Sequence, residues 1–450
     1  MGRLFGTDGA RGVANTELTC ELAMQIGRAA ALVLADSNKG RRPVVMIGKD
    51  TRASGDMLEG ALTAGLCSVG ADVVLLGVVP TPAVAYLVTK YGVDAGIMIS
   101  ASHNPCEYNG IKIFSGTGYK LPDDVENEIE AIVLDNAREI PAPTGGSVGM
   151  VTRNTAAVDE YIEHVASTID VRLDGLRIAL DCANGSSSAT AAKLFTALGA
   201  NFEIFNSTPD GVNINEKCGS THIEGLQQIV REQGFDAGFA FDGDADRCLA
   251  VDNNGKLVDG DYIMALLAED MTERGVLSGN AIVGTILTNM GFHKFCAERG
   301  MKFVAAKVGD RYVLEEMRKN GYNLGGEQSG HIIFLDYCTT GDGQLTAVQI
   351  CGLLARSGKK FSEFTSLITP YPQTMVNVRV TPEGKAKLAT CEAVNSAVSA
   401  AENELGDSGR IIVRMSGTEP LIRVMTEGEN EQQIIRIANE LADVIKTHLG

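Results

Sequence analysis

The sequence predicts an α/β protein with three related domains, each built on a mixed or parallel sheet, followed by a smaller α+β domain. Three observations favour this fold: strand-like and helix-like segments alternate, one glycine motif recurs ahead of polar loops, and the pattern changes after Pro370. The chain has 450 residues, enough for three or four domains of roughly 75–150 residues each.

Short apolar runs and longer amphipathic runs alternate in three stretches of the chain. We expect strands at 44–47, 73–76, 177–181, 202–205, 281–285 and 302–305. We expect helices at 58–68, 83–91, 188–198, 223–233, 291–299 and 311–320. This alternation is typical of mostly parallel sheets covered by helices. Ligand-binding loops should therefore lie at the carboxyl ends of the strands.

A glycine motif, Gly-x-Asp/Asn-x-Gly, recurs ahead of the most polar loops. It begins at Gly92 and Gly234 and, in a looser form without a clear strand, at Gly321. The loops that follow are 100–104, 242–246 and 326–331. Three such repeats indicate related domains that direct their loops toward a common point.

The pattern after Pro370 is that of a separate α+β domain. We expect a strand at 375–380, a long helix at 385–405, paired strands at 410–415 and 421–426, and a final helix at 429–448. The predicted domains are 1–155, 156–255, 256–369 and 370–450.

Composition and net charge argue against some classes of binding partner. A hydrophobic fraction of 44% and a charged fraction of 21% are typical of a folded globular protein, and the net charge of −18 argues against nucleic acid. The ten cysteines form no CxxC pair or metal-ligand cluster, as expected for reduced thiols in a cytoplasmic protein. We find no secretory signal or bilayer-length apolar stretch and expect no membrane partner.

Asp242, Asp244 and Asp246 alternate in a loop between two apolar segments. Three carboxylates this close repel one another unless a cation holds them, which indicates a hard divalent metal such as Mg²⁺. An EF-hand is excluded because Arg247 and Asn253 occupy positions that need Gly and Glu. The alternative is a solvated acidic turn.

Ser102 and His103 lie in the loop after the apolar segment 97–99. A hydrolase would need a G-x-S-x-G elbow and an orienting acid, and the sequence has neither. With a carboxylate metal site elsewhere, Ser102 is better interpreted as the carrier of a phosphoryl group that the metal would neutralise. A capped turn is the alternative.

Two further loops have the chemistry of ligand binding. Glu327 and Ser329, between glycines, can bind vicinal sugar hydroxyls, although a plain β-turn explains the loop equally well. The C-terminal loop resembles a phosphate cradle, or else a tight hairpin with two exposed arginines. Its candidate residues are Arg414, Ser416, Gly417, Thr418 and Arg423.

Two glycine-rich loops complete the set. In segment 5–12, Arg11 is a candidate partner of the transferring phosphoryl group. In segment 48–55, capping and turn formation explain most residues.

Taken together, these motifs resemble the α-D-phosphohexomutase family. The resemblance runs in order from F-G-T-D-G-A-R-G through S-A-S-H-N-P, D-G-D-A-D-R and G-E-Q-S-G-H to R-x-S-G-T-E-P-x-x-R-V. It covers essentially the whole chain. It implies four domains around a central cleft, the fourth similar to the TATA-binding-protein fold.

The resemblance also implies a role for each matching residue. Ser102 would be the phosphoserine, which shares a Mg²⁺ ion with Asp242, Asp244 and Asp246. Glu327 and Ser329 would hold sugar hydroxyls, and Arg414, Ser416, Gly417, Thr418 and Arg423 the distal phosphate. The transfer site would be lined by Arg11, His103, Lys112, Arg247 and His331, with Lys112 or His331 as proton carrier.

G-E-Q-S-G-H and the opening R-L-F-G-T-D-G-A-R-G look like the bacterial branch that acts on glucosamine phosphates. The implied reaction interconverts glucosamine 6-phosphate and glucosamine 1-phosphate through glucosamine 1,6-bisphosphate, for UDP-N-acetylglucosamine and cell-wall synthesis. We expect a monomer or a homodimer. The alternatives are a mutase for glucose or mannose phosphates and a non-catalytic sugar-phosphate sensor.

Overall fold

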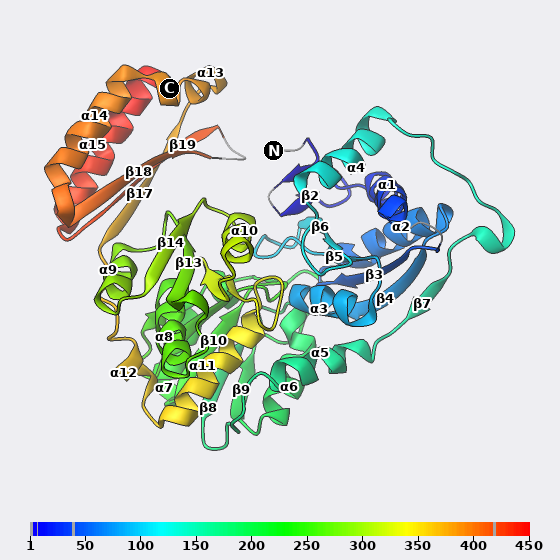
Figure 1. The fold of residues 1–450 in the computed structure, drawn as a ribbon, viewed down its shortest axis with the longest axis horizontal. Helices are drawn as coiled ribbons and strands as arrows, with labels where there is room; N and C mark the ends of the chain where they lie inside the picture. Colours follow the sequence, from blue (N-terminus) through cyan, green and yellow to red (C-terminus); the bar gives the residue numbers. More distant parts are fainter. Residues whose placement is uncertain (1–2, 7, 38–40, 417–419) are drawn as a thin grey trace. The chain divides into compact units, whose positions relative to one another are not determined.

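The computed structural model describes residues 3–6, 8–37, 41–416 and 420–450. It divides into two compact units. The first contains residues 1–287 and 301–367, and the second contains residues 288–300 and 368–450. Each sheet is described below within its own unit (Figure 1). No helix in the described part of the chain is both long and apolar enough to cross a membrane.

The first sheet of the larger unit has seven strands in the order β1-β2-β6-β5-β3-β4-β7. Their bounds are Phe5–Gly6, Gly9–Val13, Tyr108–Ser115, Ala95–Ile99, Val44–Lys49, Asp72–Val78 and Val151–Arg153. One face is covered by α1 (Cys20–Ser37), α2 (Ser54–Ser68) and α4 (Asp123–Asp135), and the other by α3 (Thr81–Tyr91) (Figure 1). The central strand β5 is buried throughout its length.

The second and third sheets of this unit are smaller. The second has the order β12-β11-β10-β8-β9, with bounds Leu257–Val258, Cys248–Asp252, Ala237–Phe241, Arg177–Asp181 and Asn201–Phe205. The third has the order β14-β13-β15-β16, with bounds Lys302–Ala306, Ala281–Thr285, Leu324–Gly326 and Ile332–Phe334. Their helices are α5 Ala157–Ala166, α6 Ala191–Ala197, α7 Glu224–Gln233, α8 Gly260–Glu273, α10 Asp310–Asn320, α11 Gly343–Ser357 and α12 Phe361–Phe364.

The three sheets repeat one local arrangement. In each, a buried strand delivers a polar loop and the chain returns antiparallel to that strand, in the pairs β5–β6, β10–β11 and β15–β16. The third repeat, expected to lack a clear strand, has the three-residue strand β15. This strand was not predicted because its residues, Leu-Gly-Gly, have weak strand propensity. Glycine is required there, since a Cβ at Gly325 would lie 2.6 Å from Met317 Sδ and 2.8 Å from the Val283 carbonyl oxygen.

The second unit has an antiparallel sheet in the order β17-β19-β18, with bounds Gln373–Arg379, Leu421–Gly428 and Gly409–Met415. The helices are α9 Met290–Glu298, α13 Pro382–Ala386, α14 Glu392–Leu405 and α15 Glu431–Leu449. Pairing of the last two strands is confirmed. The predicted α/β class with a smaller C-terminal α+β region is confirmed as well.

The continuous helix predicted for 385–405 is wrong. The chain forms α13, a 3₁₀ turn at Leu388–Thr390 and then α14. Thr381 caps α13 by accepting a hydrogen bond from the Gly384 amide, and a Cβ at Gly384 would lie 1.9 Å from the Leu449 carbonyl oxygen. Docking of α13 against the end of α15 therefore overrides the helical periodicity.

Asp342 is the N-cap residue of α11, and its ionisation should make the stability of the folded protein depend on pH. Its Oδ1 accepts the Leu345 amide at 2.9 Å, its Oδ2 accepts the Tyr161 hydroxyl at 2.9 Å, and burial raises its pKa to about 7. The folded protein therefore binds more protons at Asp342 than the unfolded chain between about pH 4 and pH 7. Its contribution to stability is full below that window and is lost as the pH rises through it.

We expect Asp342→Asn to flatten this dependence. The amide keeps an acceptor for Leu345 and Tyr161 and cannot ionise, so the variant should gain stability relative to wild type as the pH rises from 5 to 8. Urea unfolding at both pH values measures the difference. The same relative stability at pH 5 and pH 8 would contradict the assignment.

Candidate active site

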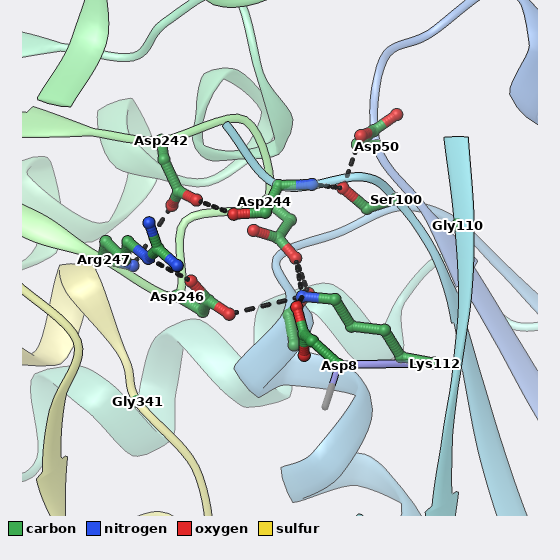
Figure 2. A network of polar contacts seen from close by, with 12 residues as sticks. Asp8, Asp50, Ser100, Gly110, Lys112, Asp242, Asp244, Asp246, Arg247 and Gly341 are labelled. Carbon is green, nitrogen blue, oxygen red and sulfur yellow. Dashed lines mark hydrogen bonds and ion pairs between the residues drawn. The ribbon is translucent and has the colours of Figure 1, made fainter. Parts of the chain in front are cut away.

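The polar loops that follow β5 and β10 meet in the larger unit. Ser102 lies after β5, and Asp242, Asp244 and Asp246 lie after β10. Lys112, on β6, reaches the same point (Figure 2). Although β5 and β10 belong to different sheets, their loops meet, and the side chains that the sequence predicted to act together are in direct contact.

Ser102 is completely buried and is aimed at the aspartate loop. Its hydroxyl donates a hydrogen bond to Asp242 Oδ2 at 2.5 Å. Its backbone φ is 53°, in the left-handed region that residues other than glycine seldom adopt. Its amide donates to Ser100 Oγ at 2.9 Å. Ser102 is therefore held by its backbone in a conformation that presents the hydroxyl to a carboxylate.

The three aspartates form a buried cluster suited to a metal ion. One oxygen from each lies within 4.8 Å of the others. Asp244 Oδ1 and Asp246 Oδ1 are buried and accept no hydrogen bond. Burial and the charges of Asp246 and Asp244 raise the pKa of Asp242. Unsatisfied oxygens and mutual repulsion are both relieved by a hard cation, so the donor set fits a divalent metal. The alternative of a solvated acidic turn is excluded by burial of the cluster.

Gly243 allows the loop after β5 (residues 100–107, the serine loop) and the loop after β10 (residues 242–247, the aspartate loop) to touch. A Cβ at this position would lie 2.5 Å from the Ser102 carbonyl oxygen and 2.8 Å from Ile214 Cδ1. Gly185 approaches from the other side, where a Cβ would lie 2.4 Å from the Gly243 carbonyl oxygen. Close backbone approach, rather than a special dihedral angle, therefore requires glycine between the first two aspartates.

Lys112 compensates the negative charge of the cluster. Its Nζ lies 2.7 Å from Asp244, 3.1 Å from Asp8 and 3.4 Å from Asp246, and the side chain is buried. Burial lowers the pKa of Lys112, but the carboxylates of Asp244 and Asp8 outweigh it and raise the pKa overall. This arrangement suits a fixed positive charge.

His103 does not act on the Ser102 hydroxyl as a hydrolase base. Its Nδ1 lies 3.3 Å from Ser102 Oγ, but Arg247 Nη1 lies 3.2 Å from the same nitrogen. A guanidinium can only donate, so Nδ1 is an acceptor and the ring is neutral. Burial and Arg247 lower the pKa of His103 to about 4. The serine proton faces Asp242, which agrees with the rejection of a hydrolase.

Arg247 and Arg11 bring two more positive charges to the site. Arg247 donates its amide to Asp242 Oδ1 at 3.2 Å. Arg11, on β2, forms an ion pair with Asp8, which also binds Lys112 and Lys120. Asp8 was not singled out from the sequence, although it stands inside the F-G-T-D-G motif. The N-terminal segment predicted as a polar loop is in fact the strand pair β1–β2, which fixes Arg11 beside β6.

His331 lies at the start of β16 between two carboxylates. Its Nδ1 is 3.6 Å from Asp246 Oδ1, and its Nε2 is 3.6 Å from Asp310 Oδ2. These charges raise the pKa of His331 despite its burial, whereas the Gly341 amide donates to Nε2 at 3.0 Å and favours the neutral ring. His331 therefore touches the edge of the aspartate cluster.

Glu327 and Ser329 stand on the adjoining loop between β15 and β16. Glu327 Oε1 accepts the Gly309 amide at 3.1 Å, and Ser329 is exposed. The loop is fixed to the second sheet, because the Cys248 amide donates to the Gly330 carbonyl at 3.0 Å. Cys248 is the first residue of β11, directly after the aspartate loop. Glu327 and Ser329 are therefore held close to that loop.

The predicted phosphate-binding residues belong to the second unit. Arg414 on β18 and Arg423 on β19 are directly opposite in the antiparallel register, and Ser416 is buried. Burial and the charge of Arg423 lower the pKa of Arg414. Like charges placed opposite each other are unfavourable unless an anion joins them. Gly417 and Thr418 lie outside the described residues.

The loops around Ser102 concentrate backbone strain. Of the ten described residues other than glycine with positive φ, seven lie in this loop network: Ser102, Ala183, Asn184, Asn206, Asn215, Lys217 and Ala245. Hydrogen bonds connect them, for example from the Asn215 amide to the Ala183 carbonyl at 2.9 Å. At Ser102, strain of this kind persists because the surrounding contacts fix a functional geometry.

Comparison with known proteins covers the full chain. Models of phosphoglucomutase/phosphomannomutase match as alpha/beta/alpha domain I at 2–139, domain II at 159–255, domain III at 259–371 and C-terminal domain at 375–444. Phosphoglucosamine mutase of Clostridium novyi (strain NT) is 52% identical over 446 residues, 99% of each chain. Phosphoglucosamine mutase of Acetivibrio thermocellus is 52% identical over 450 residues, 100% of each chain.

Solved structures agree on the fold. A phosphoglucomutase/phosphomannomutase family protein from Burkholderia thailandensis has a TM-score of 0.82 at 25% identity, covering 100% of this chain and 98% of that one. Aspergillus fumigatus N-acetylphosphoglucosamine mutase in complex with GlcNAc-6P and magnesium has a TM-score of 0.66 at 17% identity, covering 100% and 96%. With four domain models in order along its length and relatives at half identity from end to end, this chain belongs to the phosphoglucomutase/phosphomannomutase family.

Proposed function

We propose that this chain is an isomerase that interconverts glucosamine 6-phosphate and glucosamine 1-phosphate, with Ser102 as the phosphoryl carrier. The observation that carries the proposal is the contact of the buried Ser102 hydroxyl with Asp242, inside a cluster of carboxylates suited to a metal. The choice of sugar is supported by the full-length relatives named phosphoglucosamine mutase.

The reaction has two transfers that share one carrier. Phospho-Ser102 gives its phosphoryl group to O1 of glucosamine 6-phosphate, so the Oγ–P bond breaks as the O1–P bond forms. Glucosamine 1,6-bisphosphate then reorients in the site and returns its 6-phosphoryl group to Ser102. Glucosamine 1-phosphate leaves. The same compound would restore the phosphoserine when it is lost, which makes it the activator as well as the intermediate.

The charged side chains around Ser102 supply most of the proposed catalysis. Arg11, Arg247 and Lys112 surround the position of the transferring group with fixed positive charge, beside the neutral ring of His103. Such preorganised charge is the main source of rate enhancement in phosphoryl transfer. Mg²⁺ held by Asp242, Asp244, Asp246 and an oxygen of phospho-Ser102 would neutralise charge on that group. Of the two candidate proton carriers, Lys112 and His331, the raised pKa of Lys112 favours His331.

Substrate recognition is divided between two loops. Glu327 and Ser329 would bind the sugar hydroxyls. Arg414 and Arg423, opposite one another in the register, would share the phosphate that is not being transferred, together with Ser416, Gly417 and Thr418. One phosphate site can serve both orientations of the intermediate because the two ends of a bisphosphate carry the same group.

The proposal also includes a cytoplasmic location, a monomeric or homodimeric state, and domain boundaries at 1–155, 156–255, 256–369 and 370–450.

The alternative is a mutase that acts on glucose or mannose phosphates and would use the same carrier. Turnover of glucosamine 6-phosphate and glucose 6-phosphate by one enzyme preparation separates the two, because faster turnover of the glucose compound would reassign the sugar.

Mass spectrometry of the intact protein and its peptides tests the phosphoenzyme. After incubation with glucosamine 1,6-bisphosphate and Mg²⁺, we expect a phosphate-sized mass increase on the peptide that contains Ser102. Adding glucosamine 6-phosphate should remove it, because transfer to the sugar empties the carrier. The absence of modification at Ser102 before and after incubation would refute the proposed mechanism and leave a protein that only binds sugar phosphates.

A further inference from the structure

The buried side chain of Arg52 binds carbonyl oxygens between Ser102 and Tyr108 through four of its five N–H donors, and binds Asp50 through the fifth. Nε donates to Asp50 Oδ2 at 2.9 Å. Nη1 donates to the carbonyls of Pro105 and Tyr108, and Nη2 donates to those of Ser102 at 2.9 Å and Asn104 at 2.8 Å. The guanidinium is fully desolvated, with 0% of the side chain exposed. Four carbonyls, three from the loop and one from the first residue of β6, therefore converge on a single planar group.

Asn215 binds the same two carbonyls from another sheet. It lies in the segment between β9 and α7, and its Nδ2 donates to the Ser102 carbonyl at 2.9 Å and to the Asn104 carbonyl at 3.2 Å. Both amide hydrogens are thus used, and both lone pairs of the Ser102 carbonyl are occupied. The serine loop is therefore hydrogen-bonded both by Arg52, which follows β3 of the first sheet, and by Asn215, which follows β9 of the second sheet.

The amide of Ser102 is tied to the same group. It donates to Ser100 Oγ, which donates to Asp50 Oδ2 at 2.6 Å, and Asp50 is the ion-pair partner of Arg52. Figure 2 shows Ser100 between Asp50 and the aspartate loop. Each polar backbone atom of Ser102 therefore has a partner that leads back to Arg52, Asn215 or Asp50.

We infer that Arg52 and Asn215 are positioning residues for phosphoryl transfer: by holding the carbonyls of Ser102 and Asn104 they fix the left-handed backbone that aims Ser102 Oγ at the aspartate cluster. Neither residue touches the reacting atoms. The carrier stays in place while its phosphoryl group leaves and returns, because its anchors are all main-chain contacts. The inference rests on the proposed function of Ser102.

Asn215→Asp is the sharpest test, since it keeps the size and the preference for positive φ but removes both donors. A carboxylate opposite two carbonyls should shift the loop, and a displacement of the order of 1 Å slows an oriented transfer by roughly 100-fold. Asn184→Asp is the matched control. Asn184 is also buried with positive φ, at 48°, but its amide contacts Asn213 and Thr208 instead of the serine loop.

The measurement is the single-turnover rate constant for loss of phosphate from labelled phospho-Ser102 to glucosamine 6-phosphate. This rate constant is independent of how much enzyme is folded, whereas the amplitude counts the folded sites. We expect Asn215→Asp to lower the rate constant roughly 100-fold with KM within about two-fold, and Asn184→Asp to leave it unchanged. A reduced amplitude with an unchanged rate constant would show a merely structural role and overturn the inference.

Arg52→Met and Arg52→Lys form a second, independent pair. Lysine restores the charge beside Asp50, so it should recover part of the thermal stability lost in Arg52→Met, but an ammonium cannot span four carbonyls and should not recover the rate constant. Recovery of both the thermal stability and the rate constant in Arg52→Lys would overturn the inference.

If wild-type enzyme transfers no phosphate from Ser102, the proposed function and the inference are both refuted. If wild type transfers and the variants match it, the inference alone falls.

Discussion

Ser102→Ala is expected to lower turnover by about five to six orders of magnitude, because removal of a covalent carrier abolishes the step that it carries. The hydroxyl makes its close contact with Asp242, and the loop is held by main-chain hydrogen bonds that alanine retains. The variant should therefore remain folded, with an unfolding free energy within about 1 kcal/mol of wild type.

Two measurements check this expectation. Steady-state turnover of glucosamine 6-phosphate gives the loss of activity, and calorimetric titration with glucosamine 1-phosphate should give nearly unchanged affinity. Wild-type enzyme stripped of phosphate supplies the matched reference, since it has the same loop without the group. Activity of Ser102→Ala near that of phosphorylated wild type would disprove the role of Ser102 as carrier.

Lys112→Met is expected to destabilise the protein by about 3–5 kcal/mol when divalent metal is absent, because a buried positive charge is removed from three carboxylates. Asp244 would then lose its ion pair with Lys112, and, among the described residues, Asp8 would keep only Arg11 and Lys120. A divalent cation should restore part of the loss, since it supplies the missing charge to the same cluster. Turnover should stay low even with metal.

Urea unfolding with and without MgCl₂ measures this coupling. Lys49→Met is a suitable control, because Lys49 also faces two carboxylates, Asp56 at 2.5 Å and Glu59 at 2.7 Å, away from the aspartate cluster. Its stability should not depend on the metal. Equal dependence on MgCl₂ in both variants would contradict the assignment of a metal site to the aspartates.

The site was predictable where residues close in sequence act at the ends of strands. The loops 100–104 and 242–246 each follow a short apolar segment after a glycine turn, and this shared pattern predicts that they act together although their strands lie in different sheets. Arg52 was not predictable as part of the site. Its partners are carbonyl oxygens about fifty residues further along, and no side-chain pattern marks a carbonyl. The sequence alone left Arg52 as one more residue of a polar turn.

The helix α11 (Gly343–Ser357) could not be predicted from the sequence. In α11, residues 343–354 are all buried, so the helix has no polar face and no amphipathic period. The segment 385–405 shows the opposite failure. There the period is present, but contact with the end of α15 divides the helix. Tertiary contacts, which the local pattern does not contain, decide both cases.

The glycine between the first two aspartates has a consequence for how such an enzyme can diversify. Because the main chain at Gly243 meets the Ser102 carbonyl with no space for a Cβ, the direct contact of two backbones sets the distance between the proposed carrier and the proposed metal ligands. Side chains elsewhere can then vary without altering it. On the proposed roles of Glu327 and Ser329, mutations in their loop would redirect the enzyme to another sugar while the transfer chemistry is inherited unchanged.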